Sequence, residues 1–394
     1  MVISTKVATF LENASFIRKM FEEGERLRQE FGAENVFDFS LGNPEIEPPA
    51  EFKEALKKLA LEPISGMHRY MPNAGYPDTR MAVAQALADD IGLPFNENHI
   101  VMTCGAGGAL NVVLKAILNP GEEIIILKPF FVEYKFYIDN HGGAFKEVST
   151  NAQFGLDIAA IEEAISEKTR GIIINSPNNP TGVVYSAESL AELGKMLAAK
   201  EAALGRPIFL ISDEPYSKLV FDGMTVPSVF SNIKNSIVVT SHSKDLALPG
   251  ERIGYVAISP NIEEGAQLMG GLVFCNRTLG FVNAPALMQR LVTNLQKAPA
   301  NIANYQEKRD ILYDNLTAMG YKMQKPQGAF YLFPESPVPN DIEFVDIAKN
   351  HRILIVPGTG FGQPGYFRIS FSVEKDMILR ALPAFKALAE ELKL

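Results

Sequence analysis

One lysine in the sequence stands among residues that suit covalent chemistry with a phosphate-bearing molecule. Lys244 follows the apolar run that ends at Val239, with the hydroxyls of Ser241 and Ser243 before it and Arg252 after it. Hydroxyls and a planar cation bind an anion, and an amine forms a Schiff base with an aldehyde. A lysine after a strand is otherwise an ordinary solvated charge. Its neighbours therefore indicate an aldehyde cofactor that carries a phosphate.

A glycine-rich turn offers backbone N–H groups to a phosphate. Gly105, Gly107 and Gly108 follow the apolar run 100–102 and open a helical pattern. Unpaired N–H donors and partial positive charge at a helix N-terminus favour an anion. The dinucleotide spacing G-x-G-x-x-G is incomplete, because Leu110 stands at the third glycine position. A tight turn without a ligand is the alternative interpretation.

Two further polar motifs follow apolar runs, where ligands collect at the carboxyl ends of strands in open α/β sheets. Asp213 and Tyr216 come after the run 208–211, and the motif Ser-Pro-Asn-Asn-Pro-Thr-Gly at 176–182 comes after the run 171–174. An acidic pair after a strand is often a turn cap, and prolines and asparagines by themselves make turns. The four motifs therefore have to be interpreted together.

These motifs need a framework that brings the ends of distant strands together. Short β-branched runs alternate with helical patterns between about residues 99 and 260, which predicts an α/β fold with a mostly parallel sheet and helices on both faces. Helices are expected over 109–117, 156–168 and 186–204. The expected strands contain residues 100–102, 124–127, 171–174, 208–211, 237–239 and 253–256.

The pattern changes after about residue 261, and a smaller α+β domain is expected there. The N-terminal helical stretch 16–31 should return to it through a strand-like piece at 37–40. The small domain should contain helices at 285–298, 301–319 and 375–392 and strands at 321–323, 330–333, 353–356 and 367–371. The chain then divides into an N-terminal arm with part of the small domain (1–45), a large domain (46–284) and a small domain (285–394).

Composition excludes several classes of protein. The 394 residues are 47% hydrophobic and 21% charged, as in a folded globular chain. The net charge of −9 gives no general attraction for nucleic acid, and no apolar stretch reaches the length of a membrane span. The only cysteines, Cys104 and Cys275, are expected to be buried free thiols, which favours a cytoplasmic location. No metal site is expected.

In this order, the motifs resemble the signature of the class I and II aminotransferases, pyridoxal 5′-phosphate enzymes of the aspartate aminotransferase fold (fold type I). The resemblance runs from about residue 38 to 371. It rests on Gly42-Asn43-Pro44, Tyr70 with Gly75, the glycine turn, Pro129 with Phe131, Asn179 to Gly182, Asp213 with Tyr216, Ser241 to Gly254, Pro357 to Gly362, and Arg368. Ser176, Thr79 and His242 depart from the usual residues, but none of them replaces a catalytic group.

The resemblance implies catalytic roles for three residues. Lys244 would hold pyridoxal phosphate as a Schiff base and move a proton between substrate and cofactor. Asp213 would keep the pyridine nitrogen protonated, and Tyr216 with Asn179 would contact the ring hydroxyl oxygen. Phe131 would stack on the ring, with an ordinary core position as its alternative.

The resemblance also implies contacts with phosphate and substrate. Tyr70 would reach the phosphate from the second subunit of a homodimer. Arg368 would grip the substrate α-carboxylate, unless it forms an ordinary ion pair, and Gly42 and Asn179 would lie near the substrate. The phosphate itself would be held by Ser241, Ser243, Arg252 and the turn Gly105, Ala106 and Gly107.

The implied activity is transfer of the amino group of an L-amino acid, with aspartate as a candidate, to a 2-oxo acid such as 2-oxoglutarate. A C–S β-lyase remains open, because the same cofactor pocket labilises different bonds. A nicotinamide-dependent dehydrogenase has only the incomplete glycine turn and the parallel sheet in its favour. Arg277, ahead of Asn283-Ala284-Pro285, is a candidate for binding a second substrate carboxylate, with a structural ion pair or a solvated position as its alternative.

Overall fold

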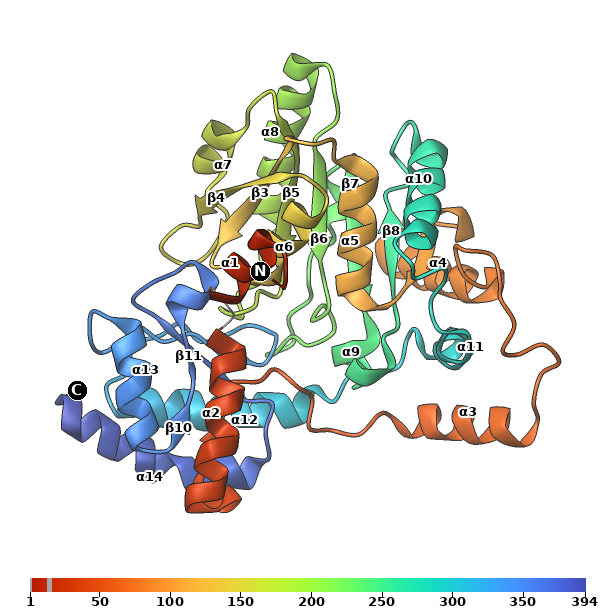
Figure 1. Ribbon diagram of the computed structural model, residues 1–394. Coiled ribbons are helices and arrows are strands. Elements are labelled where there is room, and N and C mark those ends of the chain that lie inside the picture. The colour runs from red at the N-terminus through yellow and green to blue at the C-terminus, as the bar shows by residue number, and fades with distance from the viewer. Residues whose placement is uncertain (1, 13–15) are drawn as a thin grey trace.

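A seven-stranded sheet forms the centre of this computed structural model, which describes residues 2–12 and 16–394 (Figure 1). The strands are β2 (Ile100–Thr103), β3 (Glu123–Lys128), β4 (Ala144–Ser149), β5 (Thr169–Asn175), β6 (Phe209–Asp213), β7 (Ser236–Ser241) and β8 (Gly254–Ile258). Their order is β2-β8-β7-β6-β5-β3-β4. Strand β8 alone runs opposite to the other six strands, so the prediction of a mostly parallel sheet is confirmed.

Helices cover both faces of this sheet, as expected. Alternate side chains of one strand enter different cores: Ile172 and Ile174 pack on one face and Ile173 on the other. One face is covered by α4 (Pro77–Ile91), α7 (Ile158–Ala164), α8 (Ala187–Leu204) and α11 (Ala286–Val292), and the other by α5 (Gly105–Ile117), α6 (Glu133–Asn140) and α10 (Gly265–Thr278). We call this assembly the large lobe.

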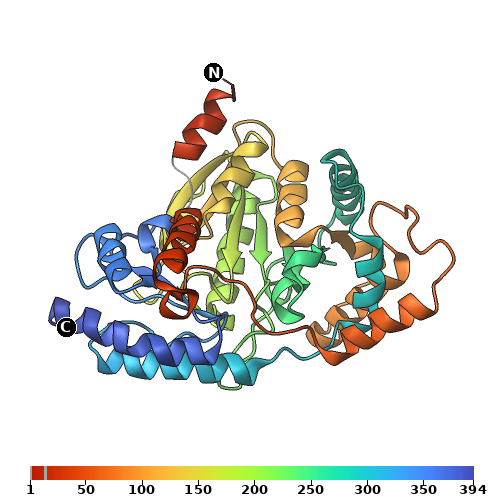
Figure 2. The ribbon, with the colours of Figure 1, turned by 60° about the horizontal axis from the view of Figure 1, so that its bottom comes forward.

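The small lobe combines the N-terminal stretch with the last third of the chain. A strand β1 (Phe37–Asp38) pairs in parallel with β10 (Ile353–Leu354), which confirms the expected return. The strands β11 (Val356–Pro357), β12 (Phe367–Ser370) and β9 (Tyr331–Leu332) form a second, antiparallel sheet. Helices α2 (Phe16–Phe31), α12 (Ile302–Ala318), α13 (Asp341–Asn350) and α14 (Lys375–Leu392) complete the lobe, with α12 and α14 side by side (Figure 2).

Some expected elements differ from the structure. The predicted strand at 321–323 is wrong, because Tyr321 packs into the core from irregular backbone. The predicted helix 156–168 is reduced to α7, which Asp157 caps by accepting from the Ala160 N–H. The helix expected at 285–298 ends with α11 and a short 3₁₀ turn at 293–295. Cys275 is buried, but Cys104 is only half-buried at the start of α5, which corrects the expectation for that thiol.

The boundary expected between the large domain (46–284) and the small domain (285–394) remains a proposal. Met288, Leu291 and Val292 of α11 pack in the core of the large lobe, so we infer that the chain crosses to the small lobe between α11 and α12. Helix α3 (Ala50–Leu61) lies at the end of extended connections (Figure 1), and its buried Phe52 joins the core of the large lobe beside α11. Within the described ranges, no helix is long and apolar enough to cross a bilayer.

Candidate active site

A cavity of about 300 Å³ lies where β5, β6 and β7 end, and both lobes line it. All of the predicted site residues except Gly105 and Tyr70 line this cavity: Gly42, Ala106, Gly107, Phe131, Asn179, Asp213, Tyr216, Ser241, Ser243, Lys244, Arg252 and Arg368. The carboxyl ends of parallel strands share one edge of the sheet, which is why motifs far apart in sequence meet here.

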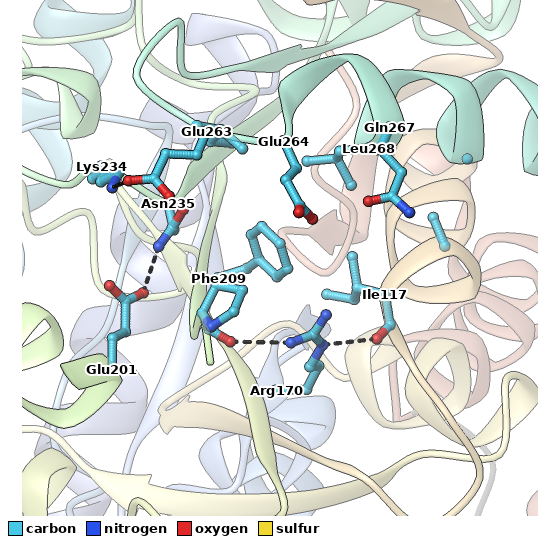
Figure 3. Close-up of a pocket in the computed structure, with 14 residues that line it drawn as sticks. Ile117, Arg170, Glu201, Phe209, Lys234, Asn235, Glu263, Glu264, Gln267 and Leu268 are labelled. Atoms are coloured by element: carbon cyan, nitrogen blue, oxygen red, sulfur yellow. Dashed lines mark hydrogen bonds and ion pairs between the residues drawn. The ribbon is translucent and has the colours of Figure 1, made fainter. Parts of the chain in front are cut away.

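A larger cavity of about 660 Å³ lies at the opposite edge of the sheet, where β6 and β7 begin (Figure 3). It contains none of the predicted site residues. Its polar groups are largely paired within the wall: Lys234 with Glu263 at 2.5 Å, and Arg170 with the carbonyls of Ile117 and Pro207 at 3.1 and 3.2 Å. Size alone therefore does not identify the reactive cavity.

Lys244 lies on α9 (His242–Asp245), the short helix that follows β7. Its Nζ donates a hydrogen bond to the Gly42 carbonyl at 2.6 Å. Burial, with the nearby cations Arg368 and Arg252, lowers the pKa of Lys244 to about 8. A larger fraction of its amine is therefore free near neutral pH than for an exposed lysine, as a nucleophile or base requires.

Asp213 ends β6 and is buried. Its Oδ2 accepts a hydrogen bond from the Tyr134 hydroxyl at 2.6 Å, whereas its Oδ1 is buried and has no partner among the described residues. Burial raises the pKa of Asp213 to about 7, and the hydrogen bond from Tyr134 opposes this rise. A cationic N–H placed at Oδ1 would satisfy the oxygen and favour the carboxylate. The sequence analysis did not identify Tyr134.

The opposite end of the cavity offers donors for an anion. Ser241 Oγ donates to Ser243 Oγ at 3.0 Å, and Ala106 and Gly107 lie in the first turn of α5. The Arg252 guanidinium extends past the same turn. Gly105 does not line the cavity: its φ is +72°, and a Cβ there would lie 2.8 Å from Arg252 Nη2. This glycine therefore allows the arginine to approach the turn.

Arg368 reaches the cavity from the small lobe and is buried there. It forms no ion pair with any carboxylate in the described ranges, so the alternative of an ordinary ion pair is wrong. Its Nη1 donates to Asn179 Oδ1 at 3.0 Å and its Nη2 to the Ser40 carbonyl at 2.5 Å. The ring of Tyr331, a cavity residue that the sequence analysis also missed, lies 4.6 Å from the guanidinium carbon. Such an uncompensated cation suits a substrate carboxylate.

Besides Gly105, two further candidates do not line the cavity. Tyr70 is 88% exposed, and Arg277 is exposed on the last turn of α10, where its guanidinium carbon lies 5.5 Å from the centre of the Phe274 ring. Asn276 Nδ2 donates to the Asn73 carbonyl at 3.0 Å, so the segments that carry these two side chains lie side by side. Neither residue contributes to the cavity of its own chain.

The geometry can be compared with known families. The model of the family "Aminotransferase class I and II" matches residues 34–385. The chain belongs to this family. The aminotransferase is 31% identical over 352 residues to the aspartate/prephenate aminotransferase of Thermus thermophilus, with 87% of this chain and 88% of that one covered.

Other relatives show how widely the family match extends. The aminotransferase is 30% identical over 396 residues to aromatic-amino-acid aminotransferase 2 of Thermococcus litoralis, with 97% of each chain covered. The solved structure of an aminotransferase from Eubacterium rectale superposes with a TM-score of 0.96 at 39% identity over 100% of both chains. The protein is thus a pyridoxal-phosphate-dependent aminotransferase of the aspartate aminotransferase fold, and the dehydrogenase alternative is wrong.

Proposed function

We propose that Lys244 binds pyridoxal phosphate covalently and that this cavity transfers the amino group of an L-amino acid, with aspartate as the first candidate, to 2-oxoglutarate. One observation carries the proposal. A lysine with a lowered pKa, a carboxylate oxygen without a partner and a guanidinium that donates only to neutral oxygens all line one cavity. These are the groups that a ring aldehyde, a pyridine nitrogen and a substrate carboxylate require.

The residues present fit the cofactor. Asp213 Oδ1 would accept from the pyridine N–H, and its lack of another partner supports this role. Phe131 would lie against the ring, and Tyr216 and Asn179 would contact its hydroxyl oxygen. The phosphate would be held by Ser241, Ser243, Arg252 and the backbone N–H groups of Ala106 and Gly107, with Gly105 making room for Arg252.

Side chains of the protein then bind the substrate and move its proton. When bound, pyridoxal phosphate supplies an electron sink for the pair left at the substrate Cα. Lys244 Nζ, as the free amine, takes the proton from the substrate Cα and passes it to the cofactor, because a proton returned to Cα would leave the amino group where it was. Arg368 binds the α-carboxylate through two parallel hydrogen bonds, and Asn179 and the Ser40 carbonyl hold its guanidinium in position.

Substrate choice depends on the far end of the cavity. The relatives named above act on aspartate, prephenate or aromatic amino acids, so the family does not decide among them. Arg277 would bind a second carboxylate only from a neighbouring subunit, because it does not line its own chain's cavity. An end-point screen of L-amino acids with 2-oxoglutarate and pyruvate tests the choice. Release of pyruvate from cystathionine without amino transfer would favour the C–S β-lyase instead.

The covalent assignment has a direct test. Lys244→Ala should keep the fold but lose the yellow absorbance and nearly all turnover, because anchor and proton carrier vanish together. Lys218→Ala is the control, since Lys218 lies near α9, pairs with Asp245 at 3.4 Å and does not line the cavity. An unchanged spectrum in Lys244→Ala would refute the assignment.

We also infer a homodimer in the cytoplasm. The segment around Tyr70 and the end of α10 form one exposed face that includes Phe274, which is 57% exposed. Large hydrophobic side chains exposed on one face support contact with a second copy of the chain. Tyr70 would then reach the cavity of that second copy. The two free cysteines support a reducing compartment.

A further inference from the structure

Two tyrosines meet where the cofactor end and the carboxylate end of the cavity adjoin. Tyr216 Oη and Tyr331 Oη are 2.9 Å apart, and both side chains line the cavity. The exposed fractions are only 5% for Tyr216 and 2% for Tyr331, so this hydrogen bond is largely shielded from solvent.

The Tyr331 side chain is fixed from several directions. Its ring lies beneath the Arg368 guanidinium, and its backbone belongs to β9, which pairs with β12. Its hydroxyl also lies against Gly42, where an added Cβ would be only 2.0 Å from Tyr331 Oη. Gly42 must therefore be a glycine to admit this hydroxyl, and the carbonyl of the same Gly42 accepts from Lys244.

The hydrogen bond between the two tyrosines can run in either direction, because each hydroxyl has one hydrogen. In the proposed function, Tyr216 uses its hydrogen for the ring oxygen of pyridoxal phosphate. Its own oxygen then accepts from Tyr331. In the described ranges, the Tyr331 hydroxyl has no hydrogen-bond partner other than Tyr216.

We propose that Tyr331 is a positioning residue for Tyr216: its hydroxyl donates to the Tyr216 oxygen, turns the Tyr216 hydrogen toward the cofactor and strengthens the bond donated there. A hydroxyl that accepts a hydrogen bond becomes a better donor. A better donor at the ring oxygen favours its ionised form, which lowers the pKa of the nitrogen that joins Lys244 to the cofactor. This inference rests on the proposed function.

Tyr331→Phe tests the inference, because it keeps the ring beneath Arg368 and removes only the hydroxyl. A pH titration of the cofactor absorbance should show the pKa of the lysine–cofactor nitrogen raised by about half a unit or more, as expected for loss of about 1 kcal/mol of hydrogen bonding. The kcat should fall several-fold, while KM for the amino acid stays within about twofold. Tyr321→Phe is the control, since its buried hydroxyl donates to the Phe385 carbonyl at 3.3 Å, away from the cavity.

A double variant separates positioning from a general structural effect. In a Tyr216→Phe background, Tyr331→Phe should cause no further change in the titration, because its effect passes through Tyr216. An unchanged titration in the single variant, or an additive change in the double variant, would overturn the inference. A raised KM without a change in the titration would also overturn it, since Tyr331 would then act through Arg368. These results are independent of Lys244→Ala, whose unchanged spectrum would instead refute the proposed function.

Discussion

At the scale of single residues, the cavity contains two buried charged groups that lack partners of opposite charge. Arg368 donates only to neutral oxygens, and one oxygen of Asp213 accepts nothing from the described residues. A buried charge without a counter-charge lowers the stability of the folded protein. Ligands that supply the missing charges should therefore raise the unfolding temperature.

Substitution of Asp213 should separate catalysis from folding. Asp213→Ala should lower turnover by about 10²-fold or more, because the charge opposite the pyridine nitrogen is lost. The cofactor-free variant should unfold close to the wild-type temperature, because removal of a poorly paired buried carboxyl is opposed by loss of the hydrogen bond from Tyr134. Steady-state rates and thermal unfolding measure the two effects. Rates within a few-fold of wild type would mean that Asp213 is only a turn cap.

The lowered pKa of Lys244 predicts how cofactor loading depends on pH. Only the free amine attacks the aldehyde, so the loading rate should rise with pH and level off above about pH 8. Stopped-flow absorbance after mixing cofactor-free protein with pyridoxal phosphate measures this rate. In Arg368→Met the midpoint should move to higher pH, because one of the cations that lower the pKa of Lys244 is gone. A midpoint near that of an exposed lysine would contradict the prediction.

At the scale of elements, the contact of α8 with the loop before β7 depends on a helical glycine. A Cβ at Gly194 would lie 2.4 Å from the Asn232 carbonyl oxygen, which is backbone and cannot rotate away. Gly194→Ala should therefore destabilise the protein by about 1–3 kcal/mol, read as a lower midpoint of thermal unfolding. Gly270→Ala in α10 meets nothing within 4 Å and should stabilise by up to about 1 kcal/mol. Equal effects of the two substitutions would refute this packing argument.

The elements for which prediction and structure differ each have a physical cause. The edge strand β4 carries mostly exposed side chains, so it lacks the apolar run that marks β5 or β6. Tyr321 is a core residue, but burial of an aromatic side chain does not require a strand. Buried apolar runs such as those of β5 and β6 depend on local sequence, and those predictions are confirmed.

The same distinction explains which cavity residues could be predicted. Most of the cavity residues could be predicted from motifs at strand ends and from the family resemblance. Tyr134 and Tyr331 are recognised only when their hydroxyls meet Asp213 and Tyr216, and 79 and 115 positions respectively separate the partners in the chain. The spacing of residues in the local sequence gives no sign of such long-range contacts.

At the scale of the whole molecule, a shared site predicts complementation between two inactive variants. In a mixed dimer of Lys244→Ala and Tyr70→Ala subunits, one cavity would combine an intact Lys244 with an intact Tyr70. Random exchange should restore activity toward about one quarter of wild type, because half of the dimers carry one complete site. Mixing, a native mass measurement to confirm exchange and an activity assay test this. Exchange without any gain in activity would argue against a shared site.

The pairing of β1 with β10 also has a consequence for folding during synthesis on the ribosome. Phe37 lies beside Ile353, so the first strand of the small lobe emerges long before its partner exists. At about 5–20 residues per second, synthesis of the intervening chain lasts about 15–60 s. Throughout that interval Phe37 and the apolar side of α2, including Met20 and Leu27, lack the core that later buries them. A chain truncated before residue 353 would therefore lack the partner strand of β1 and could not complete the core around Phe37, Met20 and Leu27.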